Sequence, residues 1–346
     1  MNPERQEASV TAEGELCPPE RSAGLERILV FSAEPAPQKN VVALKFGGSS
    51  LLGAERMLHA AHLVKDESRT RPVTVVVSAM KGVTDKLLHV GHLLEQSRNP
   101  LARKEAESVA ELHRSTLDEL HLDPDEHERV EEELALLTGD LLHEAPLRRP
   151  VEVNGAVLDR LASFGERYAA RLFAGALGKA GVLAVPVASS DFVLTCDTFR
   201  NAKPHLDHTR RRGREILLPL LEAGVVPVVT GFIGATQDGR ITTLGRNSSD
   251  FSGALIAHVV DAEELVIWTD VDGIYTANPK VSAEAKLLHE LSYDEAHALA
   301  ASGAKVLHPY VLPLAAQTEM TVWVRNTFKP HGRGTRIGAQ LNGGLA

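Results

Sequence analysis

The chain has 346 residues, of which 43% are hydrophobic, so it is long enough for one large α/β domain with a buried core. Its 37 Lys and Arg residues against 46 Asp and Glu residues give a net charge of −9, which offers no general attraction for nucleic acid or anionic lipid. No apolar run approaches the length of a membrane span and the acidic start is unlike a signal peptide, so we expect a cytoplasmic protein acting on a small molecule.

The first 39 residues are predicted to form a mobile leader, because they are rich in Glu, Pro, Ser and Ala and lack a sustained apolar period. A catalytic domain is expected over residues 40–338, with a short tail at 339–346. The two cysteines, Cys17 and Cys196, have no metal-ligand neighbours in the sequence, which suits a reducing compartment.

Strands and helices are predicted to alternate along the domain. Continuous apolar or β-branched runs indicate buried strands at residues 41–46, 73–78, 183–187, 225–230, 265–269 and 321–325. Apolar positions at helical spacing indicate helices from about residue 53 and at residues 84–96, 102–120, 124–144, 157–179, 206–222 and 249–260. Asp238 and Gly239 predict a hairpin that leads into residues 241–243.

This order predicts an α/β fold, a three-layer α-β-α sandwich with a mainly parallel sheet and helices on both faces. The charged helices within residues 100–145 are expected to form an antiparallel hairpin insertion that covers one side of the sheet. Ligands of such sheets bind beyond the carboxyl ends of the strands, and each glycine-rich segment considered below follows a predicted strand.

The first candidate site is the segment KFGGSS at residues 45–50. It places the cation of Lys45 at a strand end, and Gly47 and Gly48 would let backbone amides approach a polyanion such as phosphate. An ordinary strand-to-helix turn explains these residues equally well. The spacing is not that of a Walker motif, which disfavours the P-loop fold.

The second candidate is the segment LGRNSSD at residues 244–250, which leads directly into a helix. Unpaired amides and the positive end of the helix dipole would face an anion there. Ser249 or Asp250 taken alone is more simply explained as a helix N-cap. Arg246 favours the anion site, because a guanidinium matches a carboxylate or phosphate.

Two further segments are ambiguous on their residues alone. Residues 268–275 carry two carboxylates and a tyrosine that could bind a nucleotide, but taken alone Asp272 and Gly273 are more simply explained as a turn. Lys286 could reach a phosphate, but taken alone it is more simply explained as a solvated charge. Glu166, in a helical pattern among small residues, is either a surface carboxylate or one that holds a substrate ammonium.

Taken together and in order, six segments over residues 41–337 resemble those of aspartate kinases in the amino acid kinase family. They are KFGGSS, VVVSAMKGVTDKL, SFGERYAARL, TGFIGATQDGRITTLGRNSSD, IWTDVDGIYTANPK and SGAKVLHP. Asn247 and residues 324–327 look like the kinase portion of bifunctional aspartate kinase/homoserine dehydrogenases. Such relatives continue into regulatory ACT domains and a dehydrogenase, so we expect neither dehydrogenase activity nor feedback inhibition through ACT domains in this chain.

The resemblance implies a kinase that uses ATP and Mg²⁺ to phosphorylate the β-carboxylate of L-aspartate, giving 4-phospho-L-aspartate and ADP. Lys45 and Asp250 would be the catalytic groups. The substrate would be bound by Glu166, Arg246, Ser249, Ser78 and Phe232. The nucleotide would be bound by Lys45, Gly47, Gly48, Ser49, Thr269, Asp270, Tyr275, Lys280 and Lys286. No general base is needed, because a carboxylate is already ionised at neutral pH.

The sequence also departs from the family pattern. Lys280 stands where many relatives have Arg, and a lysine keeps the positive charge but lacks the forked, bidentate donors of a guanidinium. Ser248 replaces a common glycine. Met80 and Lys81 are unusual and could alter the substrate pocket. An amino acid kinase for another carboxylate and a non-catalytic, nucleotide-binding regulatory subunit remain alternatives, and a homo-oligomer is left open.

Overall fold

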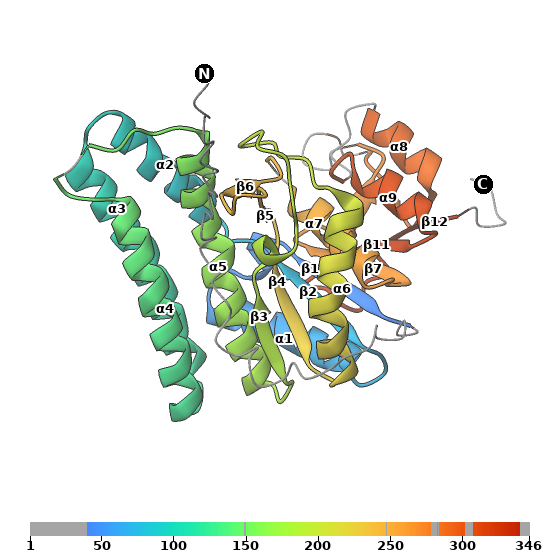
Figure 1. The fold of residues 1–346 in the computed structure, drawn as a ribbon. Helices are drawn as coiled ribbons and strands as arrows, with labels where there is room; N and C mark the ends of the chain where they lie inside the picture. Colours follow the sequence, from blue (N-terminus) through green and yellow to red (C-terminus); the bar gives the residue numbers. More distant parts are fainter. Residues whose placement is uncertain are drawn as a thin grey trace, which may run out of the picture.

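The computed structural model describes residues 40–148, 150–246, 248–277, 282, 284–301 and 307–339. Eight of its strands form one sheet: β1 (Val42–Phe46), β2 (Val73–Val77), β3 (Ala184–Val187), β4 (Val226–Thr230), β7 (Glu264–Thr269), β10 (Glu290–Ser292), β11 (Thr321–Asn326) and β12 (Thr335–Gly338). Their order is β10-β12-β11-β7-β1-β2-β4-β3 (Figure 1). Neighbouring strands run parallel except for the antiparallel pair β11 and β12, which confirms the predicted mainly parallel sheet.

The strands are hydrophobic on both faces because each face carries its own core. In β1, Val42, Leu44 and Phe46 belong to one hydrophobic cluster, whereas Ala43 and the preceding residue Val41 belong to the other. Alternate side chains of a strand point to opposite faces of the sheet, so this division shows that the sheet lies between two helical layers. The predicted three-layer sandwich is confirmed.

The helices are divided between the two cores. The first core is covered by α1 (Ala54–Ser68), α2 (Val83–Glu95) and α5 (Gly155–Lys179). The second is covered by α6 (Leu206–Glu222), α7 (Ser249–Val259), α8 (Tyr293–Ala301) and α9 (Val311–Gln317). The helices from α1 to α7 were predicted, but α8 and α9 were missed, because seven to nine residues give too few turns for a clear period.

Two small ladders lie outside the main sheet. The predicted hairpin is present as β5 (Ile233–Ala235) paired with β6 (Ile241–Thr243), and Gly239 in its turn has a φ of +79°. The strands β8 (Ile274–Tyr275) and β9 (Leu287–Leu288) form a second antiparallel ladder that was not predicted. Strands of two residues leave no alternation in the sequence from which to predict them.

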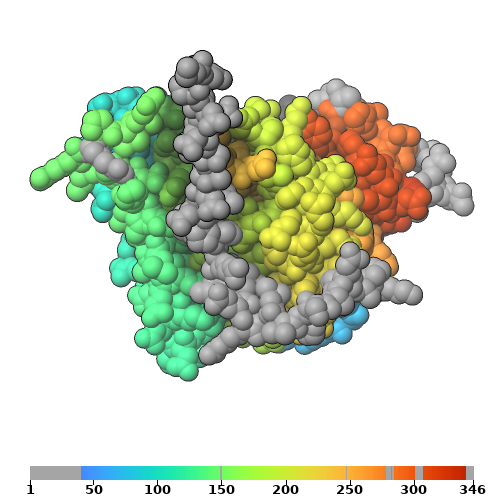
Figure 2. Space-filling view, viewed as in Figure 1, coloured from blue at the N-terminus to red at the C-terminus, as the bar shows by residue number. Residues whose placement is uncertain are grey.

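The two charged helices, α3 (Asn99–Leu120) and α4 (Pro124–Glu144), form an antiparallel hairpin. The side chain of Arg103 near the start of α3 donates to the carbonyl of Leu142 near the end of α4, at 2.9 Å. The expectation that this hairpin covers the sheet is wrong. It packs on α2 and α5, outside the layer that already covers the sheet, and adds a fourth layer (Figure 1). The space-filling view shows the hairpin and the α8–α9 region at opposite ends of the molecule (Figure 2).

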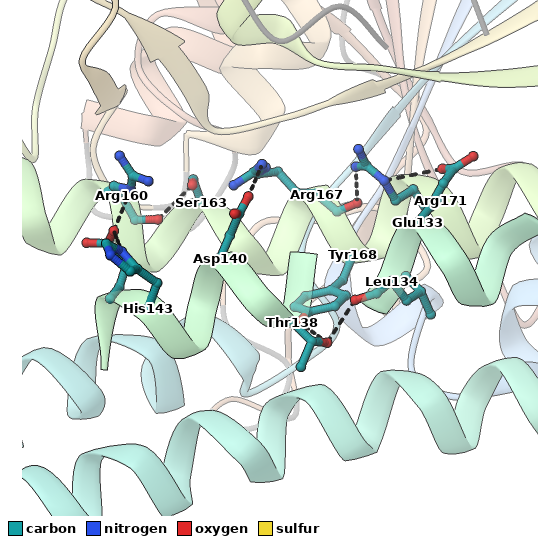
Figure 3. Close-up of polar contacts among 11 residues, drawn as sticks. Glu133, Leu134, Thr138, Asp140, His143, Arg160, Ser163, Arg167, Tyr168 and Arg171 are labelled. Atoms are coloured by element: carbon teal, nitrogen blue, oxygen red, sulfur yellow. Dashed lines mark hydrogen bonds and ion pairs between the residues drawn. The ribbon is translucent and has the colours of Figure 1, made fainter. Parts of the chain in front are cut away.

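Ion pairs set the register of α4 on α5 (Figure 3). Three pairs join the two helices, with N–O distances of 3.0, 3.6 and 3.3 Å: Arg160 with Glu144, Arg167 with Asp140, and Arg171 with Glu133. Every residue of α5 from 161 to 177 is buried except Arg167 and Arg171. Such partly exposed pairs each contribute about 1 kcal/mol or less, so they fix alignment more than they add stability. Among the described residues, no helix is both long and apolar enough to cross a lipid bilayer.

Candidate active site

A cleft of about 380 Å³ opens beyond the carboxyl ends of the central strands β1, β2 and β4. Nine of the residues to which the sequence analysis assigned a catalytic or binding role line it: Lys45, Gly47, Gly48, Ser49, Ser78, Glu166, Phe232, Arg246 and Ser249. Residues as far apart in the chain as Lys45 and Ser249, 204 positions, therefore meet at one place. This is where a doubly covered parallel sheet is expected to bind its ligand.

An ion pair joins Lys45, which lines the cleft, to Asp250, which lies next to the lining residue Ser249. The Nζ atom of Lys45, on β1, is 2.6 Å from Oδ1 of Asp250, in the first turn of α7. The lysine side chain is 7% exposed and the aspartate 24% exposed. The ammonium has three donor hydrogens, so its pairing with one carboxylate oxygen leaves donors for a second anion in the cleft.

Gly48, the second of the two glycines after β1, is required by close packing against the loop after β2. A Cβ atom on Gly48 would lie 2.5 Å from the carbonyl oxygen of Ala79 and 3.0 Å from the amide nitrogen of Lys81. The Lys81 amide donates to the Gly48 carbonyl at 3.1 Å, and the Gly47 amide donates to the Trp268 carbonyl at 3.1 Å. The turn is therefore held to both neighbouring strands, and its backbone lies at the cleft wall.

Glu166 is buried, so the interpretation of it as a surface carboxylate is wrong. It lines the cleft from α5 with 3% of its surface exposed, and its Oε2 atom has no hydrogen-bond partner among the described residues. Burial raises the pKa of Glu166 to about 8, although the amides of Ala79 and of Glu166 itself and the charge of Lys45 oppose the shift. A buried carboxylate oxygen without a donor at a cleft wall suits a ligand that brings one, such as an ammonium group.

The turn before α7 presents the second predicted anion site. Ser249 and Asp250 lie within the helix, so neither is its N-cap, and the N-cap residue Ser248 makes no side-chain capping bond. The first amides of α7 are thus not capped by that side chain, and Arg246 lies exposed in the preceding turn at the cleft. Gly245 holds this turn with a φ of +96°. Asn247 lies outside the described residues.

Ser78 and Phe232 are placed by the ends of β2 and β4. The amide of Ser78 donates to the Phe46 carbonyl at 3.2 Å, which fixes it beside the strand that carries Lys45. Phe232 has a φ of +66°, and its amide donates to the Ser252 hydroxyl on α7 at 2.7 Å. Both residues line the same cleft as Glu166.

The residues expected at the nucleotide form a second group, which does not line this cleft. Thr269 ends β7 and Asp270 follows it, while Tyr275 lies on β8 opposite Leu287. Lys286 is joined to the same ladder, since its amide donates to the Thr276 hydroxyl at 3.0 Å. β7 is the neighbour of β1, so this group follows the adjacent strand of the sheet. Lys280 lies outside the described residues.

Sequence reasoning missed a buried carboxylate that supports the cleft. Asp159, on α5, is fully buried, and its Oδ2 accepts from the amides of Arg200 at 2.8 Å and Thr243 at 2.9 Å. Its Oδ1 accepts from the Thr243 hydroxyl at 2.7 Å. Burial raises the pKa of Asp159, and these bonds and the charge of Arg200 oppose the shift. The available signal was that Asp159 lies seven residues before Glu166, on the same helix face.

Arg200 and Thr243 line the cleft, together with Met80 and Lys81. The last two had been noted only as unusual residues that could alter the substrate pocket, and their position at the cleft wall agrees with that expectation. Arg200 and Thr243 had no assigned role. Their contribution depends on the fold of a loop and a hairpin that local sequence patterns do not specify.

Comparison with known proteins gives consistent results. The sequence profile described as the amino acid kinase family matches residues 40–326. The lysine-sensitive aspartokinase 3 of Escherichia coli is 33% identical over 297 residues, covering 86% of this chain and 64% of that protein. The chloroplastic aspartokinase 1 of Arabidopsis thaliana is 35% identical over 300 residues, covering 85% of this chain and 51% of that protein.

Solved structures agree with the sequence comparison. The crystal structure of E. coli aspartokinase III in complex with aspartate and ADP has a TM-score of 0.78 and 32% identity, and the match covers 88% of this chain and 65% of that one. A bifunctional aspartokinase/homoserine dehydrogenase of A. thaliana is 33% identical over 86% of this chain but only 32% of its own length. The chain thus spans from about one third to two thirds of the length of these relatives.

Proposed function

The chain belongs to the amino acid kinase family, and from that premise we propose that it transfers the γ-phosphate of ATP to the β-carboxylate of L-aspartate. The observation that carries the proposal is that one cleft combines the Lys45–Asp250 pair with Glu166 and Arg246. The Lys45–Asp250 pair suits a phosphoryl group that is being transferred. Glu166 suits the ammonium group and Arg246 the carboxylate group that all α-amino acids share.

The phosphate end of the cleft supplies positive charge on a rigid base. Lys45 would donate to the oxygens of the transferring phosphoryl group, and Asp250 would hold the ammonium in place from α7. Gly47, Gly48 and Ser49 would place backbone and hydroxyl groups against the phosphates. Phosphoryl transfer asks little covalent work of the protein, so positioning and charge provide most of the acceleration.

The acceptor end orients the amino acid. Glu166 would accept from the α-ammonium group through its unpaired oxygen, and Arg246 would bind the α-carboxylate. An oxygen of the β-carboxylate then attacks the γ-phosphorus while the bond from that phosphorus to the β,γ-bridging oxygen breaks, which releases ADP. No proton has to move, because the attacking carboxylate is ionised at neutral pH.

The residues present also fit the Mg²⁺ ion that ATP carries. Among the described residues, no group of three acidic, histidine or cysteine side chains could hold a metal ion. Mg²⁺ in kinases binds largely through ATP phosphates and water with one or two carboxylates, so such a group is not required. Asp250 is the carboxylate at the phosphate end of the cleft that could complete its ligands. When bound, the ion neutralises charge on the phosphoryl group.

The remainder of the nucleotide is proposed to lie along the second group of residues. Thr269, Asp270 and Tyr275 follow β7, next to the strand that carries Lys45, and Lys286 lies on the same small ladder. A nucleotide whose phosphates lie at Lys45 could extend toward this group across the Gly47 turn, which is bonded to the carbonyl of Trp268 on β7. Lys280 is assigned to the same group from the family resemblance.

The proposal is tested by trapping the acyl phosphate with hydroxylamine. Purified chain with ATP and Mg²⁺ should form aspartate hydroxamate and release ADP in an aspartate-dependent manner. L-Glutamate, longer by one methylene, should react at least tenfold more slowly, since a misplaced acceptor loses alignment with the phosphorus. Folded protein that releases no ADP on addition of aspartate would contradict the proposed function.

A further inference from the structure

Arg200 adopts a backbone conformation that a residue with a Cβ atom rarely takes. Its φ is +72°, in the left-handed region that favours glycine. The residue lies in the loop between β3 and α6 and lines the cleft, where its side chain is 36% exposed. A non-glycine residue is retained in this region only where surrounding contacts hold it, and such residues cluster at binding sites.

The contact that holds Arg200 is the buried carboxylate of Asp159. The Arg200 amide donates to Oδ2 at 2.8 Å, and its Nε atom lies 3.6 Å from Oδ1. The same carboxylate binds the amide and hydroxyl of Thr243, which also lines the cleft. The Asp159 carboxylate therefore positions the loop that carries Arg200 and the hairpin that carries Thr243. It also lies opposite the Nε atom of the Arg200 guanidinium. The two terminal nitrogens form no hydrogen bond to the described residues.

Arg200 lies beside the turn that carries Arg246. A Cβ atom on Gly245 would lie 2.8 Å from the side-chain oxygen of Asn201 and 3.7 Å from the Arg200 carbonyl. Arg246 likewise makes no ion pair with the described residues. Two arginines with available donors therefore line the cleft from adjacent turns, and an anion that reaches both guanidinium groups would be favoured there.

The spacing along α5 relates this end of the cleft to Glu166. Asp159, Ala162 and Glu166 lie at positions i, i+3 and i+7 of α5, on one face, and Ala162 and Glu166 line the cleft. Seven residues of helix span about 10 Å, so Arg200 lies at the end of the cleft away from Glu166 and Lys45. An amino acid whose ammonium group meets Glu166 would direct one carboxylate toward Lys45 and the other toward the two arginines.

We propose that Arg200 is a specificity-determining residue, which together with Arg246 binds the α-carboxylate of the acceptor amino acid. This assignment rests on the proposed function, because it takes the acceptor to be an α-amino acid bound at Glu166. In this proposal the guanidinium groups of Arg200 and Arg246 together bind the α-carboxylate, and Asp159 is a positioning residue that holds Arg200. Arg200 then contributes to aspartate binding and not to ATP binding.

The test uses the substitution Arg200→Gly, because glycine adopts a φ of +72° without strain. The variant should unfold cooperatively at a melting temperature near that of the wild type, because relief of the backbone strain offsets the lost charge beside Asp159, whereas misfolding would abolish the transition. Its KM for aspartate should rise about tenfold or more, the usual effect of losing a charge-assisted hydrogen bond. Its KM for ATP should stay within about twofold of the wild-type value, because the arginine does not contact the proposed ATP site.

The control is His121→Gly, at another left-handed residue, with a φ of +48°, that ends α3 far from the cleft. It should change neither KM. Arg200→Lys keeps the charge without the fork and should give a KM for aspartate between those of the wild type and Arg200→Gly.

The outcomes separate the inference from the function on which it rests. A wild-type protein that shows no aspartate-dependent ADP release overturns both. If the wild type is active and Arg200→Gly keeps the wild-type KM for aspartate, the proposed function stands and the inference is wrong. A rise in the KM for ATP in place of that for aspartate would put Arg200 on the phosphates and would also overturn the inference.

Discussion

The ammonium of Lys45 and the carboxylate of Asp250 lie 2.6 Å apart although 205 positions of sequence separate them. β1 and α7 bring them together because α7 packs directly on that strand, where a Cβ on Gly253 would lie 3.1 Å from the Cβ of Lys45. The pair is therefore formed before any ligand binds. A charge held in position in this way needs no reorganisation during phosphoryl transfer.

Lys45→Ala and Asp250→Ala are each expected to lower kcat by about 10²-fold or more, since each removes part of the preorganised charge at the transferring phosphate. Steady-state kinetics with the hydroxylamine assay would measure the effect. Lys104→Ala and Asp66→Ala, at exposed positions on α3 and α1, are the matched controls and should keep wild-type kcat. A full kcat in either Lys45→Ala or Asp250→Ala would show that the pair is not catalytic.

The KM for aspartate is expected to fall as pH rises from 6.5 to 8. The pKa of Glu166 is raised to about 8 by burial, so the free protein holds this carboxyl protonated below that pH. An ammonium ligand needs the ionised form, and binding must then release a proton, which weakens apparent affinity by up to about tenfold per pH unit. Kinetics across this range would measure the slope.

Glu166→Gln should remove most of that pH dependence and raise the KM for aspartate, while the KM for ATP stays near its wild-type value. The raised pKa of Glu166 also makes the stability of the folded protein depend on pH. The folded form binds the proton more tightly than the unfolded chain, so its contribution to the free energy of unfolding is lost as pH rises from 4.5 to about 8. A flat KM profile in the wild type would contradict the assignment.

His113 is expected to make the protein less stable in acid. It is fully buried between α3 and α5. Desolvation lowers its pKa to about 4, although a hydrogen bond to the Val109 carbonyl acts to raise the pKa. The unfolded chain binds this proton more readily, so the free energy of unfolding should fall as pH drops from 6.5 to 4, by up to about 3 kcal/mol. Urea unfolding at several pH values would measure it.

His113→Phe keeps an aromatic ring against Tyr168, whose ring centre lies 4.4 Å away, and should flatten that pH dependence. His62→Gln, on the exposed side of α1, is the control and should leave the slope unchanged. An unaltered slope in His113→Phe would assign the acid sensitivity to other groups.

Gly48→Ala is expected to lower both stability and activity. The new methyl would lie 2.5 Å from the Ala79 carbonyl, which is backbone and cannot rotate away, so the turn has to shift. Overpacking of this kind costs about 1–3 kcal/mol, and it moves the loop that borders the phosphate end of the cleft. Gly139→Ala in α4 should instead be neutral or stabilising, because no described atom other than the neighbouring backbone of α4 lies within 4 Å of the added Cβ. Thermal unfolding and kcat of both variants would be compared.

The sequence predicts those features that local patterns specify. Strands such as β1 and β2 are buried on both faces, so their unbroken apolar runs identify them. Lys45, Gly47 and Gly48 are adjacent in the chain, and their proximity at the cleft follows from one strand and one turn.

Features that depend on tertiary packing could not be predicted. Whether Glu166 is buried is decided by the docking of α5 against the loop after β2, where a Cβ on Gly165 would lie 2.6 Å from the Cβ of Ala79. The bonds of Asp159 to Arg200 and Thr243 span 41 and 84 positions and have no local signature. The α3–α4 hairpin was placed on the sheet because its apolar stripe does not reveal whether its partner is a strand or a helix.

The burial of α5 has a consequence for hydrogen exchange. Sheet, hairpin and neighbouring helices enclose it from residue 161 to 177, with only Arg167 and Arg171 reaching solvent. Its amide hydrogens should exchange with deuterium only when the whole domain opens, and therefore at the slowest rates in the chain. Glu166 lies within this segment and Asp159 lies two residues before it on the same helix, so we expect the acceptor site to be fixed to a part of the domain that opens only on global unfolding.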